Sequence, residues 1–340
     1  MTVQVRSFAK INLGLYIGAP RPDGFHDLRT VYETIALYDV VRVSLTSGAG
    51  IEIECADDRV PCDESNTCWQ LAELVLSELG LSRRVRIGIE KRLPVQGGLG
   101  AASSNAVATM IGMERLLRKP LQREARFRIA AEVGSDLPQF LVGGTSLGVG
   151  RGEEVFPLLD LPALPLVVVT PEVGVSTPRA FADWDALIEP PPGLRSASQP
   201  DVGFATPDPL TLVDGSDRLL EVSRVLSAWL SGHRNTGAPA KSGSRAGSLL
   251  SDLVRTGIEN DFERVVFPQY PALRGIKEAL LRAGAGYASL SGSGSTLYGL
   301  FRTREAAAKA VRHLRKQGLR ALATTTLGRA KYWNSLFVGR

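Results

Sequence analysis

The sequence contains little cysteine, and this excludes a disulfide framework. Its 340 residues include three cysteines, Cys55, Cys62 and Cys68, and no C-x-x-C pair occurs. Such an odd and sparse set is typical of free thiols in a reducing compartment, and it lacks the spacing of a zinc site. We therefore expect no structural metal and a cytoplasmic location.

Long apolar runs are also missing. No stretch of about 18 uninterrupted apolar residues occurs, which argues against a membrane span. The opening "MTVQVRSFAKINLGLYI" alternates apolar and polar residues and carries Arg6 and Lys10, so it lacks the apolar centre of a signal peptide. Neither export nor a membrane partner is expected.

Charge is nearly balanced over most of the chain, and the net excess of +5 comes from one end. Residues 302–340 contain ten Lys or Arg against the single acid Glu305. A basic tail is compatible with a nucleic-acid partner. However, "REAAAKAVRHLRKQG" keeps Ala307, Val311 and Leu314 on one apolar stripe, and no aromatic platform accompanies the charges. This pattern favours a helix with a solvated basic face.

Hydrophobic periodicity predicts a mixture of strands and helices. Period-two alternation predicts strands near residues 2–8, 11–18, 39–46, 51–55 and 85–91. Helices are predicted from a cap at Ser65 or Asn66 to Gly80, from about Ser103 to Arg118, over 122–133, and at "DRLLEVSRVLSAWLSG", "PALRGIKEALLRAG" and the basic segment. Later strands are predicted at "PLVVVT", "YASLS", "TLYGLF" and near 320–327. Without a strict β-α alternation, the pattern favours an α+β fold over a doubly wound sheet.

The chain is long enough for two domains, each with its own core. The Pro-rich "LDLPALP" is a candidate hinge and divides the chain into residues 1–162 and 163–340. Within the second part, residues 189–248 contain "EPPPGLRSASQPDVGF" and "SGHRNTGAPAKSGSRAGS". Such Pro, Gly and Ser density buries little surface and predicts a mobile insertion.

The stretch "RLPVQGGLGAASSNAVATM", residues 92–110, joins glycines to a predicted helix. It lacks the lysine of a Walker loop, and "GLGAAS" meets only two glycines of a dinucleotide fingerprint. A tight turn with serine caps remains possible from the residues alone. The other interpretation is an anion cradle, in which Gly97, Gly98 and Gly100 allow close backbone approach and the helix N-terminus favours negative charge. Ser103 and Ser104 would cap that helix and bond a phosphate oxygen or a hydrated Mg²⁺.

Three further segments support the anion cradle. "FAKINLGLYIGAPRPDGFHDLRTVY" comes first, then "GSDLPQFLVGGTSLGVGRGEE", and "ASLSGSGSTLYGLF" forms a second small-residue loop. In content and order these motifs resemble those of the GHMP kinases, the superfamily of galactose, homoserine, mevalonate and phosphomevalonate kinases. The opening "AKINLGLYI" and "DGFHDL" are most similar to its 4-diphosphocytidyl-2-C-methyl-D-erythritol kinase family. The resemblance covers about residues 1–185 and 258–327.

The resemblance implies a two-domain α+β fold with the active site in the interdomain cleft. The amino-terminal domain would be like the second domain of a small-subunit ribosomal protein, and the carboxy-terminal domain would be ferredoxin-like. The implied activity is transfer of the γ-phosphoryl of ATP, with Mg²⁺, to the 2-hydroxyl of 4-diphosphocytidyl-2-C-methyl-D-erythritol, in the non-mevalonate route to isoprenoid precursors. The sequence leaves the oligomeric state open between monomer and homodimer.

The resemblance also assigns residues. Asp136 matches the catalytic aspartate that takes the proton of the acceptor, although a turn residue after Gly134 would fit the sequence alone. Lys10 would lie beside it and favour its ionised form. Asn12, Phe25, His26, Phe181, Gly292 and Gly294 would bind the acceptor, with His26 at the cytosine edge and Phe181 stacked on the base. ATP would contact Pro94, Gly97, Gly98, Leu99, Gly100, Ala101, Ala102, Ser103 and Ser104, with Asn66 and Lys91 near the adenosine.

This chain departs from the family pattern where Gln96, Ala101 and Ala102 replace common glycines, and the superfamily's tolerance of small residues there implies that ATP binding persists. Two alternatives stay open. One is another GHMP kinase, acting on homoserine, mevalonate or a sugar, against which Phe25 and His26 argue. The other is a non-catalytic ligand- or RNA-binding relative, against which the retention of both Lys10 and Asp136 argues.

Overall fold

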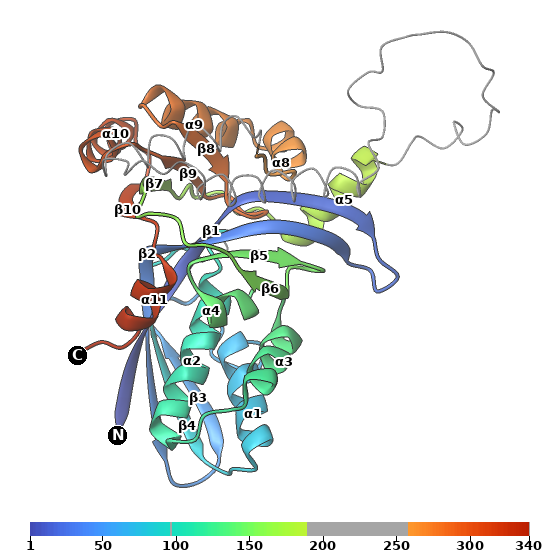
Figure 1. Ribbon diagram of the computed structural model, residues 1–340, viewed down its shortest axis with the longest axis vertical. Coiled ribbons are helices and arrows are strands. Elements are labelled where there is room, and N and C mark those ends of the chain that lie inside the picture. Colours follow the sequence, from blue (N-terminus) through green and yellow to red (C-terminus); the bar gives the residue numbers. More distant parts are fainter. Residues whose placement is uncertain (96, 189–257, 340) are drawn as a thin grey trace, which may run out of the picture.

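A computed structural model of the chain describes residues 1–95, 97–188 and 258–339. Two β-sheets stand one above the other in Figure 1, each covered by its own helices. The long β1–β2 hairpin belongs to the first sheet and reaches up beside the second (Figure 1). The predicted insertion at 189–248, with its helix "DRLLEVSRVLSAWLSG", lies outside the described residues. Among the described residues no helix is long and apolar enough to cross a membrane.

The first sheet has six strands in the order β3-β4-β2-β5-β6, with β1 paired to β2. Their bounds are β1 Thr2–Pro20, β2 His26–Thr46, β3 Gly50–Cys55, β4 Arg84–Glu90, β5 Thr145–Val149 and β6 Glu154–Pro157. Pairing is antiparallel except between β3 and β4. A register shift between Phe8 and Ala9 marks an irregularity in the β1–β2 pairing, as a β-bulge does.

The helices of this half are α1 Thr67–Leu79, α2 Ala101–Leu117, α3 Arg123–Val133 and α4 Pro138–Val142, of which α3 packs on α1 and α4. Asn66 caps α1 by accepting from the backbone N–H of Cys68, and Gly80 ends it in a left-handed conformation with φ of 62°. Both ends agree with the sequence, because these residue types suit these cap positions. Leu71 and Val75 of α1 pack with Met110 of α2 in the amino-terminal core.

The second sheet has four antiparallel strands in the order β10-β7-β9-β8. They are β7 Pro165–Val169, β8 Tyr287–Leu290, β9 Leu297–Leu300 and β10 Ala321–Thr325. The helices of this half are α5 Thr177–Ile188, α8 Glu263–Gln269, α9 Pro271–Arg282 and α10 Arg304–Lys316. The strand order is that of a ferredoxin-like fold. Ala307, Val311 and Leu314 of α10 are buried, so the basic helix packs through the apolar face that was predicted from its sequence.

A third apolar cluster joins the two sheets. Ala9, Ile11 and Leu13 of β1 pack there with Leu166 of β7 and Leu300 of β9. Successive side chains of a strand point to opposite faces, so this burial turns the intervening Lys10 and Asn12 to the other face of β1. The placement of these two polar residues thus follows from the packing between sheets.

The end of the chain returns to the amino-terminal half. In α11, Arg329–Ser335, Tyr332 packs in the core of the first sheet, and Trp333 donates its indole N–H to the carbonyl of Val142. The division at residues 162 and 163 lies between β6 and β7 and stays a prediction. Helix α11 lies within residues 163–340 of the sequence but packs with the first sheet. It is too short for a helical period to be recognised in the sequence.

Several predicted bounds were wrong. Residues 2–8 and 11–18 form one strand, and the strand predicted at 39–46 begins at His26. Helix α2 begins at Ala101, so Ser103 and Ser104 lie inside its first turn and do not cap it. Buried polar side chains such as Lys10, Thr30 and Glu33 break the apolar alternation of β1 and β2, which is why periodicity missed their full length.

Candidate active site

Lys10 and Asp136 form an ion pair although they are 126 positions apart, with 3.2 Å between Nζ and Oδ2. Lys10 is buried in β1, whereas the Asp136 side chain is 38% exposed in the turn between α3 and α4. Gly134 ends α3 and Pro138 begins α4, and this short turn presents the carboxylate to the lysine. The arrangement places an accessible carboxylate beside a shielded ammonium group.

Asn12 extends this ion pair along β1. Its amide oxygen accepts from Lys10 Nζ at 2.7 Å, and its amide nitrogen donates to Thr30 Oγ1 of β2 at 2.7 Å. Thr30 in turn donates to the carbonyl of Gly14. The side chains of Lys10 and Asn12 are therefore held in place by neighbours on two strands.

The glycine loop, residues 91–100, passes directly over Lys10. The backbone N–H of Lys10 donates to the carbonyl of Leu99 at 3.0 Å. Gly98 and Gly100 adopt φ of 76° and 66°, a region that favours glycine. A Cβ on Gly100 would lie 3.1 Å from Cγ of Lys10. The replacements Ala101 and Ala102 lie in α2, where alanine is unstrained, and Gln96 lies outside the described residues.

The N-terminus of α2 follows this loop. Gly100 is the N-cap residue and provides no side-chain hydrogen bond to the helix. The first backbone N–H groups of a helix have no intrahelical partner, and the dipole favours an anion in front of them. Ser103 is half-buried and Ser104 is buried in this first turn. The sequence interpretation of an anion cradle fits this geometry, whereas the serine caps do not.

The second small-residue loop, residues 291–296, lies against the glycine loop. Ser291 donates from Oγ to the carbonyl of Gly98 at 2.9 Å, and the backbone N–H of Thr296 donates to the carbonyl of Gly97. Gly294 approaches so closely that a Cβ on it would lie 2.5 Å from the nitrogen of Gly98. A Cβ on Gly292 would lie 3.5 Å from Lys10 Nζ, so this loop also borders the ion pair.

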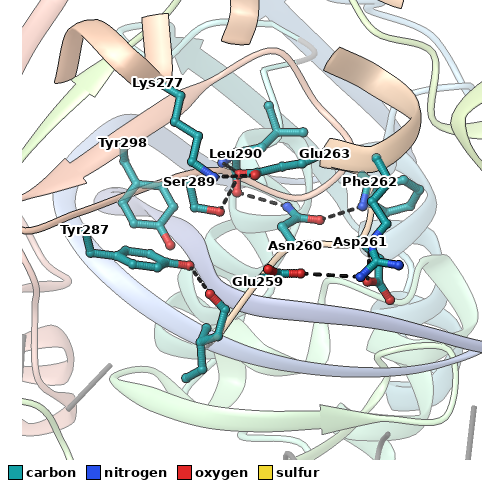
Figure 2. Close-up of polar contacts among 12 residues, drawn as sticks. Glu259, Asn260, Asp261, Phe262, Glu263, Lys277, Tyr287, Ser289, Leu290 and Tyr298 are labelled. Atoms are coloured by element: carbon teal, nitrogen blue, oxygen red, sulfur yellow. Dashed lines mark hydrogen bonds and ion pairs between the residues drawn. The ribbon is translucent and has the colours of Figure 1, made fainter. Parts of the chain in front are cut away.

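Asn260 holds the second loop, a role that the sequence analysis missed. Its side-chain amide donates to the carbonyls of Leu290 and Gly292, and its oxygen accepts from the backbone N–H of Phe262. Figure 2 shows Asn260 between Leu290 and Phe262, with Glu263 bonded to Ser289 and Lys277 nearby. The backbone N–H of Leu290 also donates to Glu263. The segment before α8 therefore positions the start of the loop.

Asp39, also missed, anchors the entrance of the glycine loop. This fully buried carboxylate of β2 pairs with Lys91 and accepts from the backbone N–H groups of Arg92 and Leu93 at 2.7 and 2.8 Å. It also accepts from the side-chain amide of Asn105 in α2. The Lys91 side chain is therefore only 9% exposed and is held against the sheet. An isolated acid in an alternating strand gives no sign of such partners.

A cavity of about 1200 Å³ adjoins the glycine loop and is bordered by both halves of the chain. From the first half it is lined by residues such as Lys91, Pro94 and Gly97, and from the second by residues such as Thr170 and Arg320. Neither Lys10 nor Asp136 lines it. Asn66 does not line it either and acts as the α1 cap, with its amide donating to the carbonyl of Pro61.

His26, Phe181 and Asp185 form a second cluster. The rings of His26 and Phe181 stack at 5.1 Å between centroids with 12° between planes. His26 Nε2 lies 2.6 Å from Asp185 Oδ1, a partner that the sequence analysis did not identify. Phe25 is 49% exposed, and the Arg151 guanidinium lies over its ring. One face of Phe181 is therefore occupied by His26, and stacking of a base on Phe181 stays a prediction.

Metal ligands do not cluster in the part of the chain that the structure describes. No three His, Cys, Asp or Glu side chains there are grouped as they would be around an ion.

Two family models match the chain, and both describe the same superfamily. The model "GHMP kinases N terminal domain" matches residues 66–144, and "GHMP kinases C terminal" matches residues 241–319. Among solved structures, a homoserine kinase from Cytophaga hutchinsonii aligns with a TM-score of 0.68 at 19% identity, covering 97% of this chain and 96% of that one. At this identity the likeness concerns the fold. The chain has the two-domain fold of the GHMP kinases.

Curated relatives show to which family within the GHMP kinases the chain is most similar. A 4-diphosphocytidyl-2-C-methyl-D-erythritol kinase from Solibacter usitatus is 36% identical over 308 residues, covering 90% of this chain and 84% of the relative. One from Chlorobium limicola is 35% identical over 327 residues, covering 95% and 97%. A crystal structure of 4-(cytidine 5'-diphospho)-2C-methyl-D-erythritol kinase aligns with a TM-score of 0.66 at 27% identity, covering 95% of this chain and 98% of that one. The chain belongs to the 4-diphosphocytidyl-2-C-methyl-D-erythritol kinase family.

Proposed function

We propose that the protein transfers the γ-phosphoryl group of ATP to the 2-hydroxyl of 4-diphosphocytidyl-2-C-methyl-D-erythritol, a step toward isoprenoid precursors. In this reaction the acceptor oxygen forms a bond to the γ-phosphorus as the bond to the β,γ-bridging oxygen breaks. ADP leaves, and the hydroxyl proton passes to a base. The observation that carries the proposal is the Lys10–Asp136 ion pair beneath the glycine loop.

ATP would bind with its phosphates at the glycine loop. Support comes from the positive φ of Gly98 and Gly100 and from the uncapped N-terminus of α2, where backbone N–H groups are available to an anion. The adjoining cavity has room for the adenosine, and Lys91 and Pro94 line it. Leu99, Ala101, Ala102, Ser103 and Ser104 complete the proposed phosphate contacts, and Asn66 borders the site through Thr67, whose hydroxyl donates to the carbonyl of Ala102.

Asp136 would act as the general base. A carboxylate beside the acceptor hydroxyl can take its proton as the new bond forms. Lys10 would favour the ionised carboxylate and stabilise charge on the transferring phosphoryl group, since phosphoryl transfer depends mainly on positioning and charge neutralisation. Mg²⁺ would arrive bound to the ATP phosphates as part of the substrate. The proposed cleft between the two domains would contain both substrates.

The cytidylyl acceptor would extend from Asp136 toward His26. Asn12 would hold the polyol, and its contacts with Lys10 and Thr30 already fix its orientation. His26 would read the cytosine edge, and Phe25 and Phe181 would contact the base. Gly292 would leave room for the acceptor beside Lys10, and Gly294 would contribute to the acceptor site by letting its loop approach Gly98 closely. The aromatic pair favours a nucleobase-containing acceptor over homoserine, mevalonate or a free sugar.

A coupled assay of ADP release tests this proposal against a panel of acceptor alcohols. With ATP, Mg²⁺ and the cytidylyl substrate, we expect turnover that Asp136→Asn lowers by about 10²–10⁴-fold, to a small residual rate, while binding of an ATP analogue persists. Turnover with homoserine or mevalonate but not with the cytidylyl substrate would instead indicate another GHMP kinase. Tight, salt-dependent RNA binding without ADP release would indicate a non-catalytic binder.

A further inference from the structure

A tyrosine in β2 contacts the carboxylate that we propose as the base. The hydroxyl of Tyr32 donates to Asp136 Oδ1 at 3.1 Å, while Lys10 lies at Oδ2. The two oxygens of the carboxylate thus face different partners from two strands. We propose that Tyr32 is a positioning residue that fixes the orientation of Asp136 for proton transfer. This inference rests on the proposed role of Asp136.

The ring of Tyr32 lies in a slot formed by two glycines. A Cβ on Gly148 of β5 would lie 2.4 Å from Cε2 of the ring, and a Cβ on Gly152 would lie 2.6 Å from its hydroxyl oxygen. The hydroxyl also lies 3.4 Å from the carbonyl of Gly152. Both glycines come from "GTSLGVGRGEE", a stretch whose glycines the proposed function does not otherwise use. The slot holds the ring while its hydroxyl points at Asp136.

Tyr32 can serve only as a donor to the carboxylate. Its burial, together with the negative charge of Asp136, raises the pKa of the phenol well above its ordinary value. The hydroxyl therefore keeps its proton over the pH range in which kinases are assayed. A neutral phenol donates to an ionised carboxylate and favours that form.

The charged groups around this contact are few among the described residues. Lys10 of β1 pairs with Asp136 and lies 5.4 Å from the Tyr32 ring centroid. Glu153, in the turn after β5, adds negative charge near Tyr32. Its carboxylate is already held by Arg151, whose backbone N–H donates to it at 2.6 Å. The Asp136 carboxylate is thus contacted by a charged partner, the ammonium group of Lys10, and by a neutral partner, the hydroxyl of Tyr32.

The experiment is Tyr32→Phe, which keeps the ring in its slot and removes the hydroxyl. A hydrogen bond to a charged group lost in this way lowers the rate roughly ten- to a hundredfold, so we expect kcat to fall by that factor with KM for ATP unchanged. KM for the acceptor should stay within about twofold, because the lost hydroxyl acts on the orientation of the Asp136 carboxylate and not on substrate binding.

Tyr332→Phe is the matched control. Tyr332 is equally buried at 2% exposure, and its hydroxyl donates to the carbonyl of Phe140 at 2.7 Å. This variant should lose stability without a fall in kcat. A Tyr32→Phe enzyme with unchanged kcat overturns the inference, as does one that resembles Tyr332→Phe in both kcat and stability.

A double-mutant cycle separates the inference from the proposed function. If Tyr32 acts through Asp136, Tyr32→Phe should lower the residual activity of Asp136→Asn by much less than it lowers that of the unaltered enzyme. Equal factors in the two backgrounds would overturn the inference and leave the role of Asp136 standing. An Asp136→Asn enzyme with full turnover would overturn the proposed function itself.

Discussion

The backbone N–H of Lys10 donates to the carbonyl of Leu99, and a Cβ on the next residue, Gly100, would meet the Lys10 side chain. The ammonium group and the glycine loop are therefore positioned by one set of contacts. A displacement of the loop would move Lys10 relative to Asp136. Lys10 and the glycine loop, almost 90 positions apart in the sequence, are thus in direct contact.

The first prediction concerns Gly100→Ala. Its φ of 66° is strained for alanine, and the added Cβ would lie 2.9 Å from Cζ of Phe140 and 3.1 Å from Cγ of Lys10. We expect a loss of stability of about 1–3 kcal/mol from the strained backbone and a fall in kcat of at least tenfold, measured by thermal unfolding and ADP release.

Gly80→Ala is the control for this prediction. Gly80 has a similar φ of 62° at the end of α1, but a Cβ there meets nothing within 4 Å. It should lose comparable stability while keeping kcat and both KM values. Equal kinetic losses in the two variants would show that backbone strain, not contact with Lys10, causes the effect.

The second prediction concerns Asp39→Asn. The change removes the ion pair with Lys91 and weakens the bonds from the backbone N–H groups of Arg92 and Leu93. Removing one partner of a buried ion pair costs about 3–5 kcal/mol, so the melting temperature should fall clearly. Because the entrance of the glycine loop loses its anchor, KM for ATP should rise more than KM for the acceptor.

Glu52→Gln provides the comparison for Asp39→Asn. Glu52 pairs with Arg86 on the exposed side of the same sheet, and its side chain is 42% exposed. A solvent-exposed pair of this kind contributes at most about 1 kcal/mol. An Asp39→Asn protein as stable as Glu52→Gln, with an unchanged KM for ATP, would contradict the anchoring role.

The third prediction concerns His26→Ala. Because His26 stacks on Phe181 and contacts Asp185, its loss should disturb the proposed cytosine site and leave the glycine loop intact. We expect KM for the cytidylyl substrate to rise about tenfold and KM for ATP to stay within twofold, in steady-state assays. His313→Ala, on the exposed side of α10, should change neither value. Equal increases in both KM values would argue against nucleobase recognition by His26.

The fourth prediction concerns stability and pH. Glu33 of β2 is fully buried, and burial raises its pKa to about 8 although Thr145 donates to it. In the unfolded chain the carboxyl ionises near its ordinary value, about 4.3. Between these pH values folding requires proton uptake, so the contribution of Glu33 to stability decreases as pH rises toward 8 and is full only at low pH.

Glu33→Gln tests this dependence, because an amide does not ionise and can still accept from Thr145. The melting temperature of the variant, relative to the unaltered protein, should increase from pH 5 to pH 8. Glu54→Gln, on the exposed part of β3, should show no such trend. A constant difference between Glu33→Gln and the unaltered protein over this range would mean that Glu33 folds in its ionised form.

Elements with local determinants were predicted well. Asn66 and Gly80 mark the ends of α1 because caps depend on the residues at those positions, and the burial of Ala307, Val311 and Leu314 follows from helical spacing. The full length of β1 and β2 was missed, because these strands bury polar side chains that only tertiary partners can satisfy. Lys10 and Asn12 are the clearest examples.

The sequence by itself determined the α+β class, the glycine loop with its helix, and the motifs that indicate the GHMP kinases, since each depends on neighbouring residues. Tertiary structure alone decided that Asp136 meets Tyr32, that Asp39 anchors the loop, and that α11 joins the amino-terminal core. These contacts join residues far apart along the chain. The place of Lys10 and Asn12 in the site has the same origin, because the apolar cluster between the two sheets buries one face of β1 and leaves its polar face to the site.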